Sequence, residues 1–188
     1  MAVNKIWAVK SDFGCTINYI ENEDKTIDAT IKLSDGTVLK DIENVIDYAT
    51  QTRKTLQHEA CKRYVTGINC CADTAFAEML LIKKKYEKED KILAYHAIQS
   101  FKPGEVDADT AHEIGVKLAH RMWGDRFQVV VTTHLDREHI HNHFVINSVS
   151  FLDGKKYYSN KATYELQKKL SDELCLDYGL NIIGNTNH

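Results

Sequence analysis

The sequence predicts an α+β fold with a roughly five-stranded, mainly antiparallel sheet and helices packed on it. Segments rich in β-branched residues alternate along the chain with segments of helical periodicity. Two of the strand segments, 126–134 and 141–151, are joined by only six residues, LDREHI. Such a short connection favours antiparallel neighbours over a parallel crossover. Helices interspersed among such strands predict a sandwich in which one face of the sheet is covered by helices.

The elements are expected in a regular order along the chain. Strands are expected at 3–9, 61–68, 91–101, 126–134 and 141–151, with a short hairpin arm at 156–158. Helices are expected at 12–21, 41–50, 73–88, 108–123 and 161–178. Asp73 and Asp109 are expected to be N-cap or first-turn residues of the third and fourth helices, because their carboxylates can accept hydrogen bonds from the first backbone amides.

Residues 1–188 are expected to form a single domain. The 188 residues are 43% hydrophobic and 27% charged, which is enough to bury one core, and no linker or repeat divides them. The short polar tail after Gly179 indicates the N-terminal part of a longer protein. No segment has the length of a signal peptide or a membrane span, which favours a cytoplasmic protein without membrane insertion. Five cysteines without a CxxC pair favour free thiols.

Histidines concentrated between residues 134 and 143 predict a metal site. On a strand, His141 and His143 project to the same face, which continues with Val145 and Asn147. His134 ends the preceding strand, so an antiparallel return places it beside that pair. Asp136 is expected to accept a hydrogen bond from His134 and to fix its tautomer.

The third ligand and the metal are open at this point. His139 is an alternative to His134, or a loop residue that contacts phosphate. Imidazole ligands favour the later transition metals, whereas phosphate chemistry usually uses Mg or Mn. We expect Mg or Mn, with Zn or another transition metal as the alternative in a crystal. The letters of His141-Asn142-His143 do not identify an HNH nuclease, in which those residues are dispersed over a ββα unit.

Residues 133–151, THLDREHIHNHFVINSVSF, resemble the third motif of the MOBP-class relaxases of conjugative and mobilisable elements, which belong to the HUH endonucleases. The resemblance implies that His134, His141 and His143 are the metal ligands and that Asp136 supports them. Asn147 matches the asparagine that follows the histidine pair in the family. The chain most resembles relaxases from integrative elements of Gram-positive bacteria.

Two further segments resemble family motifs in the same order. Residues 17–26, INYIENEDKT, resemble the first motif, which nominates Tyr19 as the nucleophile over its rivals Tyr95, Tyr157 and Tyr158. Residues 96–105, HAIQSFKPGE, resemble the second motif, in which Ser100 and its neighbours hold DNA near the nick. The chain departs from the family in two places. Glu23 stands where proline is frequent, and Arg137 stands where some relatives carry an acid.

The resemblance implies an enzyme that nicks and rejoins one DNA strand at an origin of transfer through a 5′-phosphotyrosine. Tyr19 would attack the phosphodiester, and either His139 or Asp136 is the candidate proton acceptor. Implied partners are origin-of-transfer DNA, as a single strand with an adjacent hairpin or duplex, and accessory relaxosome and coupling proteins.

DNA contacts are expected to be local, because 24 basic and 27 acidic residues give a net charge of −3. A single strand is usually held by aromatic stacking and by cations along a groove. Phe101, Tyr157 and Tyr158 could supply the stacking. The candidate polar contacts are Ser100, Lys102, Arg137, His139, Asn147, Lys155 and Lys156.

Two alternative functions use the same residues. A rolling-circle replication initiator has similar chemistry, but in those proteins the tyrosine commonly follows the histidines, whereas Tyr19 precedes them. A metal-stabilised DNA-binding module would hold DNA without cutting it. The covalent adduct at Tyr19 separates this module from the enzyme.

Overall fold

A computed structural model describes residues 2–10, 56–57, 62–88, 92–135 and 138–182. It contains a five-stranded sheet in the order β1-β5-β7-β6-β4, in which every neighbouring pair is antiparallel. This confirms the predicted antiparallel sheet. The strands are β1 (Val3–Lys10), β4 (Val65–Ile68), β5 (Ile92–Ser100), β6 (Val129–His134) and β7 (His141–Asn147). The short β2 (Leu56–Gln57) and β3 (Lys62–Arg63) form a separate pair.

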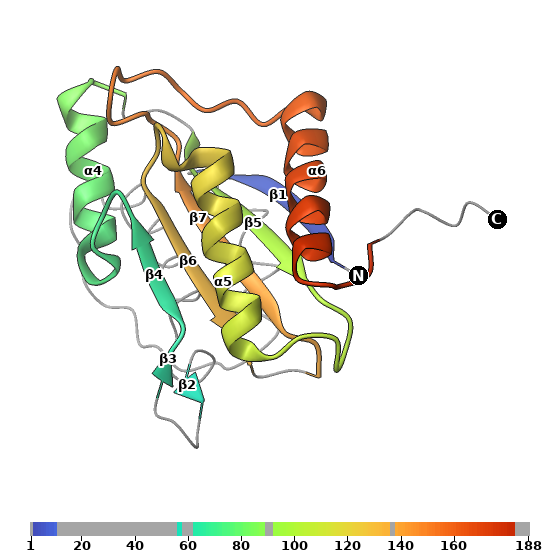
Figure 1. Cartoon of the computed structure of the whole chain (residues 1–188). Helices are drawn as coiled ribbons and strands as arrows, with labels where there is room; N and C mark the ends of the chain where they lie inside the picture. Colours follow the sequence, from blue (N-terminus) through green and yellow to red (C-terminus); the bar gives the residue numbers. More distant parts are fainter. Residues whose placement is uncertain (1, 11–55, 58–61, 89–91, 136–137, 183–188) are drawn as a thin grey trace.

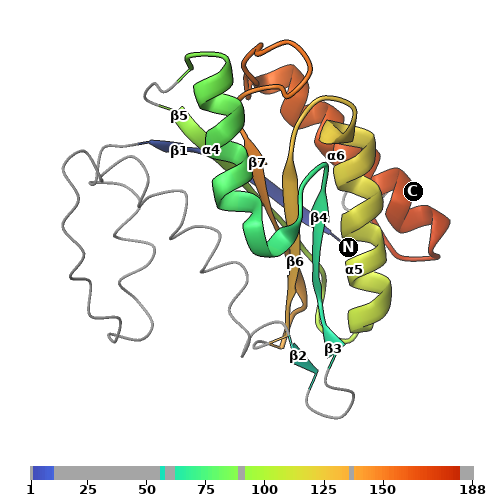
Figure 2. The same cartoon turned by 90° about the vertical axis from the view of Figure 1, so that its left-hand side faces the viewer.

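Helices cover both faces of the sheet, not one face as predicted. Figures 1 and 2 show α5 and α6 on one face and α4 on the other. The helical elements are the 3-10 turn η1 (Ala72–Thr74), α4 (Ala75–Lys85), α5 (Ala108–Ala119), the π-helical turn η2 (His120–Gly124) and α6 (Lys161–Asp177). The predicted helices at 12–21 and 41–50 lie outside the described residues.

The apolar sequence of β6 explains why both faces are covered. Val129 and Val131 pack in the core beneath α5, whereas Val130 joins the core beneath α4. All three residues are fully buried. A strand with consecutive apolar residues, in place of strict alternation, is typical of a sheet that is covered on both faces.

Polar residues define where α5 and α6 begin. Asp107 is the N-cap of α5, and its side chain accepts a hydrogen bond from the Thr110 amide at 2.7 Å. Asp109 lies in the first turn of α5, as predicted, and Asp73 lies in η1. At α6, Asn160 and Thr163 form a reciprocal capping box.

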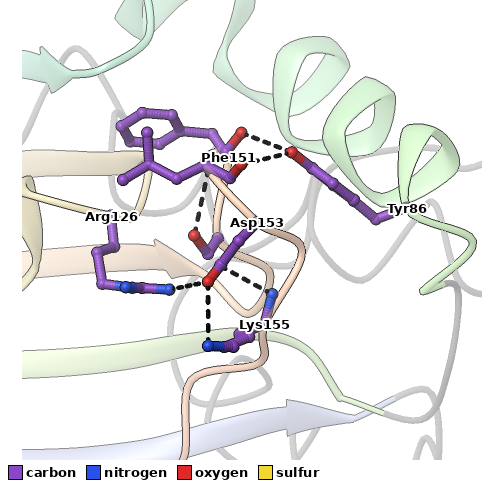
Figure 3. A network of polar contacts seen from close by, with 7 residues as sticks. Tyr86, Arg126, Phe151, Asp153 and Lys155 are labelled. Atoms are coloured by element: carbon purple, nitrogen blue, oxygen red, sulfur yellow. Dashed lines mark hydrogen bonds and ion pairs between the residues drawn. The ribbon is translucent and has the colours of Figure 1, made fainter.

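The segment after β7 forms a loop that is held by side-chain contacts. Strand β7 therefore ends at Asn147 and not at 151 as predicted. Only one bridge, Val149 with Lys156, represents the predicted hairpin arm. Asp153 binds the Arg126 guanidinium at 2.5 Å, and Tyr86 donates a hydrogen bond to the Phe151 carbonyl at 3.1 Å (Figure 3). These contacts hold the loop against the end of α4.

A row of buried polar side chains crosses the sheet beneath α5 and α6. The Asn142 side chain is at its centre. Its Nδ2 donates to Gln99 Oε1 at 3.0 Å and to the Ala111 carbonyl at 2.7 Å, and its Oδ1 accepts from Thr133 Oγ1 at 2.7 Å. Gln99 Nε2 in turn donates to Ser171 Oγ at 2.7 Å. The network joins β5, β6 and β7 to α5 and α6.

The direction of these hydrogen bonds fixes the tautomer of His112 on α5. Thr133 already gives its single proton to Asn142, so it must accept from His112 Nδ1, which lies 2.8 Å away. In the neutral ring, His112 Nε2 accepts from the Thr66 hydroxyl, also at 2.8 Å. In this arrangement every hydrogen bond along the row has one donor and one acceptor.

The cysteines among the described residues, Cys70, Cys71 and Cys175, are free thiols, as expected. Within the same residues, none of the helices has the length and hydropathy that a transmembrane span requires.

Replacing Gly115 with alanine is expected to destabilise the domain. A Cβ at this position of α5 would lie 2.5 Å from Asn142 Nδ2, and the three hydrogen bonds of that amide prevent it from moving aside. Overpacking of this kind costs about 1–3 kcal/mol, which outweighs the helix propensity gained. Urea unfolding measures the effect. Gly124→Ala is the control, because its Cβ would meet an exposed His120 side chain. A Gly115→Ala protein as stable as wild type would contradict the close approach.

Replacing Lys83 with methionine is expected to stabilise the domain at neutral pH. Lys83 is 1% exposed and donates to Ser148 Oγ at 2.6 Å. Burial, together with the charge of Lys156, lowers its pKa from 10.5 to about 7. Below pH 7 the lysine is charged in both the folded and the unfolded state, so burial of the ammonium reduces the free energy of unfolding by its full amount. This reduction becomes smaller as the pH rises toward 10.5.

The expected gain for Lys83→Met is about 2–4 kcal/mol at pH 6.5 and clearly smaller at pH 9.5. Chemical unfolding at both pH values measures it. The exposed Lys84→Met is the control and is expected to show no such pH dependence. An equal gain at the two pH values would contradict the shifted pKa of Lys83.

Candidate metal centre

Pairing of β6 with β7 brings three histidines together on one face of the sheet. His134 lies directly opposite His141, and His143 lies opposite Thr132. Residues opposite each other, and residues two apart on a strand, share a face. The ring centroids are 5.1 Å apart for His134 and His141, 4.1 Å for His134 and His143, and 4.9 Å for His141 and His143. The predicted convergence of these rings is confirmed.

The three rings fit a divalent cation. Each offers one nitrogen, and the three nitrogens lie within 4.8 Å of one another. Ligands at about 2.1 Å from a tetrahedral ion are roughly 3.4 Å apart, so small ring rotations would close the set. The exposed fractions are 1% for His134, 8% for His141 and 1% for His143, so the site is largely shielded from water. No acidic or thiol ligand joins this group among the described residues.

His139 lies beside the group but is not part of it. Its ring centroid is 5.5 Å from that of His141, and its carbonyl oxygen lies 3.2 Å from His141 Nδ1. The group that could hold a metal contains His134 and omits His139. The structure therefore favours His134 over His139 as the third ligand.

His96 is a fourth histidine at the site, and it was not among the predicted site residues. It lies on β5 opposite Val145, on the face that carries the three rings. Its Nε2 is 2.8 Å from His143 Nδ1. Burial lowers the pKa of His96 to about 3, and His134 contributes to the shift. The place of His96 could be found only from the register between β5 and β7, which the sequence does not provide.

The predicted DNA contacts of the second motif lie near the histidines. Ser100 is half-buried and stands opposite His141 in the β5–β7 register. Lys102 follows in an exposed turn, whereas Phe101 is only 2% exposed and belongs to the core. Ser100 is thus next to the triad of His134, His141 and His143, and Lys102 follows it two residues later along the chain. Phe101 has almost no surface for base stacking.

Asn147 shares the face of His141 and His143, as predicted, but it is fully buried. Its Nδ2 donates to Gln128 Oε1 at 3.0 Å and to the Met79 carbonyl of α4 at 3.3 Å. Contact with DNA would require this end of the sheet to open. The side chain instead ties β7 to α4.

Lys155 and Lys156 lie in the loop beyond the far end of β7. About seven residues of strand separate this end from His141, or roughly 20 Å. Lys155 is exposed and ion-paired with Asp153 at 3.5 Å, and Lys156 is half-buried. Lys155 and Lys156 therefore do not border the three histidines.

The described rivals of Tyr19 are placed away from the triad. Tyr95 is buried on the opposite face of β5, with its ring 5.0 Å from that of Tyr157. Tyr157 also packs on Phe127, with ring centroids 5.5 Å apart. Tyr158 is exposed in the distant loop. Tyr19, Asp136 and Arg137 lie outside the described residues.

Comparisons with known proteins identify similar sequences and a similar fold. Residues 48–180 match the family model of the MobA/VirD2-like relaxase nuclease domain. This match includes the three histidines and begins after Tyr19. A solved structure described as "Molecular Basis of Vancomycin Resistance Transfer in Staphylococcus aureus" has the same fold, with a TM-score of 0.58 at 9% identity. The alignment covers 97% of this chain and 96% of that one.

Curated relatives extend the match at the sequence level. A protein named rlx from Staphylococcus aureus is 44% identical over 117 residues, which cover 62% of this chain and 37% of that protein. The group II intron-interrupted relaxase LtrB from Lactococcus lactis subsp. cremoris is 32% identical over 180 residues, covering 88% of this chain and 30% of LtrB. The chain thus spans about a third of the length of these relatives. On this evidence, the chain belongs to the family of MobA/VirD2-like relaxase nuclease domains.

Proposed function

We propose that this chain nicks and rejoins one strand of DNA at an origin of transfer, as the nuclease part of a mobilisation relaxase. The observation that carries the proposal is the convergence of His134, His141 and His143 on one face of β6 and β7 in a chain of this family. Family membership also favours a relaxase over a rolling-circle initiator.

The triad would hold the divalent cation, with Mg or Mn as the expected ion and Zn as an alternative. Such a cation supplies Lewis-acid polarisation of the scissile phosphate. The protein contributes three neutral nitrogen ligands, which leave the positive charge of the ion unreduced. That charge favours the approach of a phosphodiester.

Tyr19 is the proposed nucleophile, on the strength of its motif. A phenol has an ordinary pKa of about 10 and needs help to lose its proton. The Tyr19 oxygen loses its proton and forms a bond to phosphorus while the bond from phosphorus to the 3′ oxygen breaks. The 3′ oxygen takes up a proton in turn, which leaves a 5′-phosphotyrosine and a free 3′-hydroxyl. The phosphotyrosyl ester retains the energy of the broken phosphodiester. Attack by a 3′-hydroxyl can therefore reseal the strand without ATP.

The remaining roles are assigned from position and motif. Asp136 would orient His134, and Asp136 or His139 would accept the Tyr19 proton. Ser100, Lys102 and Arg137 would hold the scissile strand, while Lys155 and Lys156 would contact a hairpin or duplex arm farther away. The accessory relaxosome and coupling proteins remain the proposed partners of the longer protein.

Tyr19→Phe is expected to abolish covalent capture of DNA while DNA binding stays close to wild type. The test uses an oligonucleotide carrying the origin of the encoding element, labelled at its 3′ end so that the captured fragment keeps the label. Denaturing gels detect the adduct, and mass spectrometry maps it. Tyr158→Phe is the control, because Tyr158 is 69% exposed and distant from the triad. An adduct that persists in Tyr19→Phe assigns the nucleophile elsewhere, and a wild type that binds but never forms one indicates a binding module.

Removal of one triad ring is expected to weaken metal binding at least about 100-fold, since loss of a ligand should exceed the 10–100-fold effect of losing a supporting residue. Isothermal titration with Mn²⁺ and Zn²⁺ compares wild type with His134→Ala and His143→Ala. His139→Ala is expected to bind as wild type does, because its ring is outside the group. The reverse outcome, with His139 needed and His134 dispensable, would overturn the ligand set.

A further inference from the structure

We propose that His96 is a positioning residue that holds His143 in the tautomer and orientation required for metal binding. The inference rests on the proposed metal site. It goes beyond that site because the resemblance to the family gives His96 no role. The proposal concerns the hydrogen-bond partner of a metal ligand, and it leaves the ligand set unchanged.

The register of β5 against β7 produces the contact. His96 is paired with Val145 and Ile98 with His143, so His96 and His143 are diagonal neighbours on the same face. Their ring centroids lie 5.0 Å apart, and the planes are tilted by 33°. The approach is a hydrogen bond between His96 Nε2 and His143 Nδ1, at 2.8 Å.

The proton positions follow from what a metal requires. A hydrogen bond at Nδ1 of His143 leaves Nε2 as the nitrogen that this ring can offer to a cation. Binding through Nε2 needs its lone pair, so the proton of His143 stands on Nδ1 and is donated to His96. His96 Nε2 must then accept, which puts the proton of His96 on its own Nδ1. The contact is compatible with metal only in this pair of tautomers.

The surroundings keep His96 in place. His96 is 4% exposed and His143 is 1% exposed, so water does not compete for the hydrogen bond. The Trp7 ring of β1 packs on His96, with centroids 4.5 Å apart and planes tilted by 54°. Strands β1 and β7 thus confine His96 from two sides.

An imidazole in this place differs from the carboxylate that commonly supports a metal-bound histidine. A carboxylate would place a negative charge behind His143, whereas neutral His96 accepts the same hydrogen bond without one. The site therefore keeps more of the cation's charge for the phosphate. The accepting atom alone, and not a charge, is what His96 contributes.

Metal affinity distinguishes positioning from simple packing. The full chain and its variants His96→Gln and His96→Leu are titrated with Zn²⁺ and Mn²⁺, with unfolding of the metal-free proteins measured in parallel. Leucine removes the acceptor and is expected to weaken binding 10–100-fold. Glutamine keeps an acceptor oxygen and is expected to restore most of that affinity. Replacement of the exposed His120 by Gln is the control and should change nothing.

Equal metal affinity in His96→Leu and wild type would overturn the proposal. An equal loss of metal affinity in His96→Leu and His96→Gln, in proportion to their loss of stability, would overturn it as well. If His96→Leu does not fold, nitrogen-15 NMR of the Zn²⁺-loaded wild type decides instead. The proposal requires protonated Nδ1 on both His96 and His143, and any other tautomer overturns it. A wild type that binds no metal would sink both this inference and the metal site, whereas wild-type binding with no adduct at Tyr19 would leave this inference standing.

Discussion

The antiparallel register of β6 against β7 is the constraint on which the rest of the site depends. With His134 opposite His141, alternation of side chains puts His143 on the same face, and it puts Thr133 and Asn142 opposite each other on the other face. One pairing thus sets both the ligands and the hydrogen bond between Thr133 and Asn142 behind them. The ligands and the residues that fix their backbone alternate along the same strand.

The two faces of the sheet differ in what they contain. The face beneath α5 and α6 is closed by a polar row whose donors and acceptors are matched, so it specifies how β5, β6 and β7 lie relative to the helices. On the other face, α4 covers the end that holds Asn147, where Met79 and Lys83 are buried. The three histidines lie at the opposite end of β7 on that face.

Local sequence patterns predicted His141, His143 and a nearby third histidine because two short-range facts define the group, and the family resemblance then selected His134 over His139. His141 and His143 are two residues apart on a strand, and the connection back to His134 is six residues long. His96 depends on a pairing between strands that are more than 40 residues apart, which no local pattern contains. Covering of both faces could have been recognised in the consecutive valines of β6. Periodicity placed Asn147 on the correct face but could not show that α4 covers it.

Along β7, the histidines alternate with Asn142, whose side chain is hydrogen-bonded beneath α5. This alternation limits where insertions and deletions can occur in relatives. Deleting one residue inside the strand would turn Asn142 toward the proposed metal site and move a histidine into the layer beneath α5. Length changes are therefore compatible with the site only in the connection between His134 and His141, which lies outside the bounds of both strands. Aligned relatives should keep an uninterrupted histidine–residue–histidine triplet and confine their gaps to the turn that precedes it.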